Sequence, residues 1–251
     1  MTPERLAVLA RVADGLPDLD RPVLVVVDGA DGAGKTWFAD DLGAFLEESG
    51  RPVVRASVDD FHHPRAYRHE LGRTGQTVWT RSFDYRALRQ HLLDPWCHGA
   101  GATYRRRHHD LADDLLVDEP AAHVPEHGVL VVDGVFAQRA ELAGCWDLVV
   151  WLDVPDEERV RRMADRDGVS PDPAHPDQQR YLDAQALYRA VAHPLAGADV
   201  VVDNADPERP FVVGAPAVPA GWHRTPHGLR RVVTTDAETA ARINRLLGDG
   251  A

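Results

Sequence analysis

The chain has 251 residues, a mass of 27.7 kDa and a hydrophobic content of 44%, enough for one α/β core with a small appendage. Its formal net charge is −12, which argues against a nucleic-acid binder because affinity for a polyanion depends on cations that displace its counterions. Arginine clusters in this acidic chain should therefore serve small molecules.

The first residues predict an amphipathic helix. An apolar run at 6–10 is cut short by Arg11 and Asp14, unlike a signal peptide, and no apolar run approaches membrane length. Two cysteines, Cys97 and Cys145, are too few for a disulfide framework and lack metal-ligand spacing. We therefore expect a cytoplasmic protein without a membrane partner, and a homo-oligomer is compatible with the sequence.

A phosphate-binding loop follows the first predicted strand. The β-branched run at 23–27 is typical of a parallel strand buried on both faces, and apolar residues recur at helical spacing from Trp37 to Leu46. Between them the pattern GxxxxGK[ST] is formed by Gly29, Ala30, Asp31, Gly32, Ala33, Gly34, Lys35 and Thr36. Lys35, the only lysine of the chain, would reach the β- and γ-phosphates while the loop amides bind the same anion. The GxxGxG spacing excludes a dinucleotide-binding fingerprint.

Asp133 directly follows another predicted strand, at 129–132. A carboxylate at this strand end is expected to hold Mg²⁺, or a water bound to it, opposite Thr36. The alternative is that Asp133 caps a helix beginning near residue 136.

Two adjacent aspartates, Asp59 and Asp60, follow the predicted strand at 53–57. At the carboxyl edge of an open sheet a carboxylate can accept a proton from an attacking hydroxyl or complete a metal shell. Neighbouring side chains point in different directions, so we expect only Asp59 to serve.

Further strands are expected at 148–152 and 200–202, and helices at 85–93, 156–166 and 178–192. This alternation predicts an α/β fold, the three-layer P-loop NTPase sandwich around a parallel sheet. Three prolines make 167–177 a predicted loop. We divide the chain into a main domain at 1–205 and a C-terminal extension at 206–251, with a strand at 229–233 and an amphipathic helix at 236–247.

Five segments occur in a characteristic order: the phosphate loop, DDFH at 59–62, SFDY at 82–85, VDGVF at 132–136 and RVRRMADRD at 159–167. Together they resemble the uridine kinases, within the P-loop kinase group that also contains pantothenate kinase and phosphoribulokinase. The resemblance covers about residues 21–204 and is more specific to the group than to a substrate.

The resemblance implies a kinase that uses ATP and Mg²⁺ to phosphorylate a small molecule, foremost the 5′-hydroxyl of uridine or cytidine. Asp59 falls on the catalytic base of the family and Asp84 on its ribose-binding aspartate. Tyr104 and His109 have the spacing of the pair that contacts the pyrimidine. Arginines of a lid at about 161–180 would clamp the transferring phosphate, and the candidates are Arg161, Arg162 and Arg166.

Several departures keep the acceptor open. Asp133 stands where many uridine kinases carry glutamate, and the arginines at 105–107 make the region before His109 unusually basic. These arginines could meet a carboxylate or phosphate of the acceptor, or form a solvated face. The histidine pairs at 62–63 and 108–109 lack the neighbours of a transition-metal site. A kinase for pantothenate or a sugar phosphate, and a nucleotide-dependent regulator with slow hydrolysis, are the alternatives.

Overall fold

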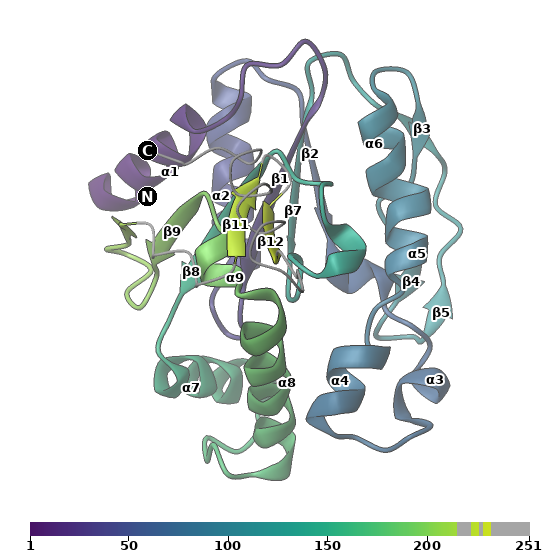
Figure 1. Cartoon of the computed structure of the whole chain (residues 1–251), viewed down its shortest axis with the longest axis vertical. Helices are drawn as coiled ribbons and strands as arrows, with labels where there is room; N and C mark the ends of the chain where they lie inside the picture. The colour runs from purple at the N-terminus through teal and green to yellow at the C-terminus, as the bar shows by residue number, and fades with distance from the viewer. Residues whose placement is uncertain (215–221, 226–227, 232–251) are drawn as a thin grey trace, which may run out of the picture.

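The computed structural model describes residues 1–214, 222–225 and 228–231, and its centre is a six-stranded sheet (Figure 1). The strands are β1 (Val23–Gly29), β2 (Val53–Ser57), β7 (Val129–Gly134), β8 (Leu148–Asp153), β9 (Val200–Asp203) and β10 (Phe211–Val213). Their order is β10-β9-β8-β1-β7-β2, and all pairs are parallel except β9 with β10. The predicted parallel sheet is confirmed.

Both faces of the sheet are covered by helices, which explains the uninterrupted apolar run in β1. Val25 and Val27 face a core with α1 (Pro3–Asp14) and α2 (Lys35–Glu48), whereas Leu24 and Val26 face the opposite core. The second core contains residues of α5 (Tyr85–Leu88), η2 (Arg89–Leu93), α6 (Asp94–His98), α8 (Pro176–Ala192) and α9 (Pro194–Gly197). The result is the three-layer α/β sandwich expected for a P-loop fold.

Further short helices gather where the parallel strands end. After β2 come η1 (Val58–Phe61), α3 (Arg65–His69) and α4 (Gly75–Arg81), and after β8 comes α7 (Asp156–Asp167). Figure 1 shows α3, α4, α7 and α8 together beyond one end of the sheet. The helices α4 and α8 pack closely, because a Cβ atom added at Gly75 would lie 2.3 Å from the Cβ atom of Asp183. The segments that follow β2 and β8 therefore meet around one edge.

Short strands complete the described part. The pairs are β3 (Thr103–Tyr104) with β6 (Ala122–His123), β4 (His109–Asp110) with β5 (Leu115–Leu116), and β11 (Trp222–Thr225) with β12 (Gly228–Arg231); η3 spans Ala140–Leu142. The predicted strand at 229–233 overlaps β12, and the helix predicted at 236–247 lies outside the described residues. β10 lies within the extension predicted at 206–251, but it pairs with β9 and so forms an edge strand of the central sheet.

One residue of the helix predicted after the phosphate loop lies differently from its apolar neighbours. Phe38 and Leu42 are buried, but Trp37 is 80% exposed on the first turn of α2. Among the helices of the described residues, none is long and apolar enough to cross a membrane.

Candidate active site

The phosphate loop joins β1 to α2 and has the backbone shape that its glycines predict. Gly32 and Gly34 have φ angles of +80° and +87°, which residues with a side chain rarely adopt. A Cβ atom at Gly32 would also lie 2.6 Å from the backbone oxygen of Arg159. The Lys35 ammonium group donates a hydrogen bond of 2.9 Å across the loop to the oxygen of Ala30. The lysine is therefore held over the loop, where it can exchange this contact for a phosphate oxygen.

Asp133, at the end of β7, contacts the first turn of α2. The Thr36 hydroxyl donates a 2.8 Å hydrogen bond to Oδ2 of Asp133, and the Arg55 guanidinium lies 2.8 Å from Oδ1. No helix begins near residue 136, so Asp133 does not act as the helix cap considered above. A hydroxyl and a carboxylate oxygen beside the loop fit Mg²⁺, which takes few protein ligands and keeps several waters. Thr36 and Asp133 are therefore the residues that could hold it.

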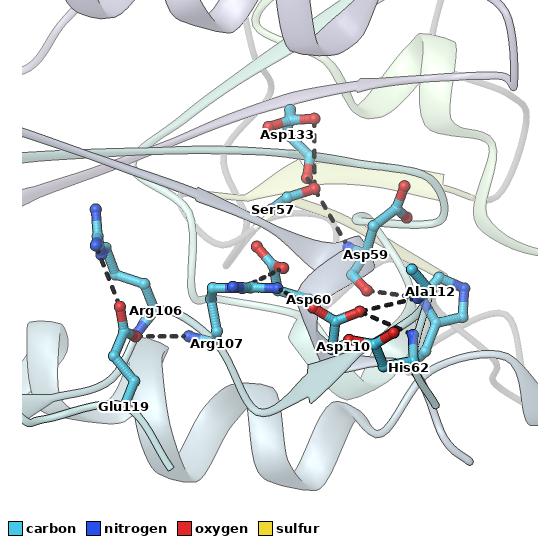
Figure 2. Close-up of polar contacts among 11 residues, drawn as sticks. Ser57, Asp59, Asp60, His62, Arg106, Arg107, Asp110, Ala112, Glu119 and Asp133 are labelled. Atoms are coloured by element: carbon cyan, nitrogen blue, oxygen red, sulfur yellow. Dashed lines mark hydrogen bonds and ion pairs between the residues drawn. The ribbon is translucent and has the colours of Figure 1, made fainter. Parts of the chain in front are cut away.

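Asp59 lies on η1, just beyond β2. No hydrogen bond or ion pair to its carboxylate is formed by the described residues, and in Figure 2 no dashed line reaches this group. Desolvation by the surrounding protein raises its pKa to about 6, although the side of the residue away from the protein is exposed to solvent; Lys35 opposes the shift and Asp31 adds to it. An unpaired carboxylate with this pKa is ionised at neutral pH and can accept a proton.

The carboxylate of Asp60, unlike that of Asp59, is paired with an arginine. Its carboxylate forms a 2.9 Å ion pair with Arg107, which also pairs with Asp110 at 3.0 Å (Figure 2). Burial raises the pKa of Asp60 while the hydrogen bond from Arg107 lowers it. Asp60 is therefore engaged in a structural contact, and Asp59 is the carboxylate left available.

The lid arginines divide between two faces of α7. Arg162 pairs with Glu158 at 2.7 Å, donates hydrogen bonds to the backbone oxygens of Asn204 and Ala205 at 3.0 and 2.8 Å, and also reaches Gly32 of the loop at 3.4 Å. Arg166 pairs with Asp167 but is near enough for its charge to lower the pKa of Asp59. The structure thus brings Arg162 to the loop, whereas the side chain of Arg166 is 69% exposed and acts on Asp59 only through its charge.

Arg161 points elsewhere. It is exposed and forms ion pairs with Glu158 and Asp165, both at 2.7 Å, along the outer face of α7. The clamp role expected for Arg161 therefore finds no support in its position. The fully buried Arg159, which was not among the predicted site residues, donates a 3.0 Å hydrogen bond to the backbone oxygen of Asp31.

A buried polar cluster under the loop was not predicted. Asp28, at the end of β1, is fully buried and accepts hydrogen bonds from the Tyr188 hydroxyl, from Gln138 at 3.1 Å and from the Gly29 amide at 2.7 Å. Burial raises its pKa to about 6, against the effect of these hydrogen bonds. Tyr188 belongs to α8, so the cluster joins the start of the loop to the helix that follows the lid.

The three residues expected to bind a nucleoside are not equally accessible. Asp84 caps α5 through a 2.9 Å hydrogen bond from the Ala87 amide and keeps a carboxylate that is 29% exposed. Tyr104 is 6% exposed and packs on Trp96, with ring centroids 5.6 Å apart. His109 is 1% exposed, and its Nε2 atom lies 3.2 Å from Oδ1 of Asp114, without the geometry of a hydrogen bond. Only Asp84 is placed where a ligand could reach it without rearrangement.

The arginines at 105–107 are all paired. Arg105 lies 4.0 Å from Asp118, Arg106 lies 3.1 Å from Glu119, and Arg107 holds Asp60 and Asp110. The triplet therefore attaches the segment around residues 118–119 to η1. It does not present free cations to a ligand.

No protein-family model matches the sequence, and comparison with curated proteins gives no match. Solved structures do share the fold. A possible uridine kinase from Bacillus stearothermophilus superposes with a TM-score of 0.62 and 24% identity, over 78% of this chain and 96% of that chain. A proposed fructose transport system kinase from Silicibacter sp. TM1040 gives 0.59 and 24% identity, over 76% and 96%.

A D-glycerate 3-kinase from Cryptococcus neoformans var. grubii gives a TM-score of 0.51 and 12% identity, over 85% of this chain and 96% of that chain. At these identities the comparisons establish the fold alone. The chain therefore has the α/β fold of P-loop kinases, and its chemistry has to be argued from its own residues.

Proposed function

We propose that the protein is an ATP-dependent phosphotransferase that requires Mg²⁺ and phosphorylates a hydroxyl group of a small molecule. The observation that carries the proposal is the position of Asp59. An unpaired carboxylate with a pKa of about 6 lies at the same sheet edge as the phosphate loop. A phosphate loop alone would serve a hydrolase or a switch as well, whereas a free base beside it suits transfer to an acceptor hydroxyl.

The other site residues would bind the nucleotide, the metal ion and the transferring phosphate. The loop amides and Lys35 would hold the β- and γ-phosphates, and Thr36 with Asp133 would hold the ion. The bound Mg²⁺ would supply positive charge that offsets the charge of the transferring group. Arg162 and Arg166 would add cations from the lid side. Asp59 would take the proton of the acceptor hydroxyl.

The finer hypothesis from the resemblance is a uridine or cytidine acceptor. Asp84 supports it, since its partly exposed carboxylate lies 3.8 Å from His63 on the segment that carries Asp59. Tyr104 and His109 support it less, because a base could reach these buried rings only after the surrounding strands moved apart. An acceptor that carries a charged group is the second candidate, favoured by the unpaired arginines described below.

The test is phosphate transfer from ATP to a set of acceptors: uridine, cytidine, pantothenate, glycerate and sugar phosphates, with and without Mg²⁺. We expect one acceptor to gain a phosphate, with one ADP formed for each product molecule. ADP formation that no acceptor stimulates would support the nucleotide-dependent regulator instead.

A further inference from the structure

Two arginines near the site have no acidic partner. Arg68 on α3 and Arg180 on α8 are both half-buried, and neither has a carboxylate within 4.0 Å among the described residues. Arg107, nearby, pairs with two carboxylates. Partly burying a guanidinium group without an acidic partner costs free energy, so two such arginines in one region need a physical reason.

Each arginine is held by neutral contacts. The Nε atom of Arg68 donates a 2.8 Å hydrogen bond to the backbone oxygen of His63. Arg180 donates a 2.9 Å hydrogen bond to the Tyr181 hydroxyl, and its guanidinium carbon lies 4.5 Å from the centre of that ring. These contacts orient the side chains, and neither guanidinium group forms an ion pair within the described residues, although Asp114 acts on Arg68 from beyond ion-pair distance and Asp167 and Asp177 line the same pocket as Arg180. Donors fixed in this way lose little freedom when an anion binds.

The two arginines come from segments that the fold brings together. The close packing of α4 on α8 at Gly75 fixes the short α3–α4 segment against the helix that carries Arg180. Burial lowers the pKa of Arg68, the charge of Asp114 opposes this shift, and the charges of Arg65 and Arg180 add to it. Arg65, Arg68 and Arg180 therefore lie near enough for their positive charges to act on one another, on a chain whose net charge is −12.

This place adjoins the proposed catalytic base. The Nδ1 atom of His62 lies 2.7 Å from the backbone oxygen of Asp59, and the charge of Arg68 helps to lower the pKa of the same histidine. On the α8 side, Asp31 of the phosphate loop influences the pKa of Tyr181, next to Arg180. Arg68 and Arg180 therefore border the region between the loop and the base, where an acceptor must bind.

We infer that Arg68 and Arg180 bind an anionic group of the acceptor, a carboxylate or a phosphate, while Asp59 activates its hydroxyl. This inference rests on the proposed function and narrows its substrate class to hydroxyl compounds that already carry a negative charge. Guanidinium groups suit this task, because their planar donors match the oxygens of carboxylate and phosphate. The arginines at 105–107 are the candidates that the sequence suggests for binding an anionic group of the acceptor. This role falls instead to Arg68 and Arg180, which were not among the predicted site residues.

A solvated surface is the ordinary explanation for an unpaired arginine. Arg86 on α5 provides the comparison, since it is exposed and has no ion pair within the described residues. Arg68 and Arg180 differ from Arg86 because both are half-buried and because the charge of Arg180 acts on Arg68. Arg86→Gln is therefore the matched control: it removes the same charge at a site without these features.

The experiment uses pairs of acceptors that differ only in charge: pantothenate and pantothenol, glycerate and glycerol, fructose 1-phosphate and fructose. Binding to the full chain is measured by calorimetry with a non-hydrolysable ATP analogue, and transfer is measured from ATP. Wild type should prefer the anionic member of at least one pair. Arg68→Gln and Arg180→Gln should each weaken that acceptor by roughly 10- to 150-fold, with the affinity for the ATP analogue unchanged. Arg86→Gln should behave as wild type. A preference for pantothenate or glycerate over its neutral partner would identify a carboxylate as the bound group, and a preference for fructose 1-phosphate over fructose would identify a phosphate.

The two proposals fail in different ways. Equal binding of charged and neutral acceptors, or anion binding that Arg68→Gln and Arg180→Gln leave unchanged, would overturn the inference while transfer itself could persist. Anion binding that depends on both arginines, without transfer from ATP to any acceptor, would support the site and overturn the proposed kinase. Circular dichroism of each variant would show that the fold is kept.

Discussion

Replacing Asp59 by asparagine separates the chemistry from the fold. The Asp59 carboxylate makes no hydrogen bond or ion pair with the described residues, so Asp59→Asn removes no structural contact and should change stability by only about 0.5 kcal/mol. Loss of a general base lowers kcat by roughly 10²- to 10⁴-fold, which corresponds to about 3 to 5 kcal/mol in the activation free energy. The KM for ATP should stay within a few-fold. The assay is steady-state phosphate transfer with the best acceptor.

The matched control is Asp60→Asn. This change breaks an ion pair whose partners are 30% and 41% exposed, a contact worth about 1 kcal/mol or less, so activity should stay within a few-fold of wild type. Equal losses in the two variants would show that Asp59 is not the base. So would a loss in Asp59→Asn that appears only in the KM for ATP.

The pH profile gives a second measure of the same role. Because the pKa of Asp59 is about 6, the carboxylate is mostly protonated at pH 5 and mostly ionised at pH 7. Only the ionised form accepts a proton, so kcat/KM should rise roughly tenfold over this interval. Asp28 titrates in the same range, with a pKa of about 6. Asp28→Asn should therefore keep the rise, whereas Asp59→Asn should lose it; the opposite pattern would assign the titration to Asp28.

Three further predictions follow from the site. Lys35→Ala should abolish turnover, and Lys35→Arg should not restore it, because the bulkier planar group cannot take the place of the ammonium between phosphates; wild-type activity of the arginine variant would contradict this. Arg162→Gln should reduce kcat by at least tenfold and Arg161→Gln should have little effect, since only Arg162 reaches the loop; equal effects would contradict the assignment. Nucleotide binding should change the tryptophan fluorescence, and Trp37→Phe should remove most of the change, because Trp37 is exposed on the first turn after the loop; an unchanged signal would place the nucleotide away from α2.

Local patterns were enough to predict the sheet and the phosphate loop. The apolar runs of β1 and β7 reflect strands buried on both faces, and the glycines at 32 and 34 have the positive φ angles that their loop requires. The strand ends also placed Asp59 and Asp133 at one edge, because parallel strands end together. These are properties of short segments or of the sheet as a whole.

The remaining features depend on contacts that short segments do not reveal. Asp28 and Tyr188 are 160 positions apart, and their contact exists only because α8 packs beneath the loop. Tyr104 and His109 have the expected spacing, but they lie on β3 and β4, which pair with different strands, and both side chains are buried. The difference between Arg161 and Arg162 follows from helix geometry: in a helix over 156–167, adjacent residues point about 100° apart, so the two side chains leave the helix in different directions, although both reach Glu158.

The central claim is that this chain transfers phosphate from ATP to a hydroxyl group activated by Asp59. The most direct measurement is ³¹P NMR of wild type and Asp59→Asn incubated with ATP, Mg²⁺ and the paired acceptors. The account predicts that wild type forms a phosphate ester in step with ADP, and that Asp59→Asn forms the same ester at least 100-fold more slowly. Release of inorganic phosphate by both proteins at equal rates, with no ester formed from any acceptor, would contradict it.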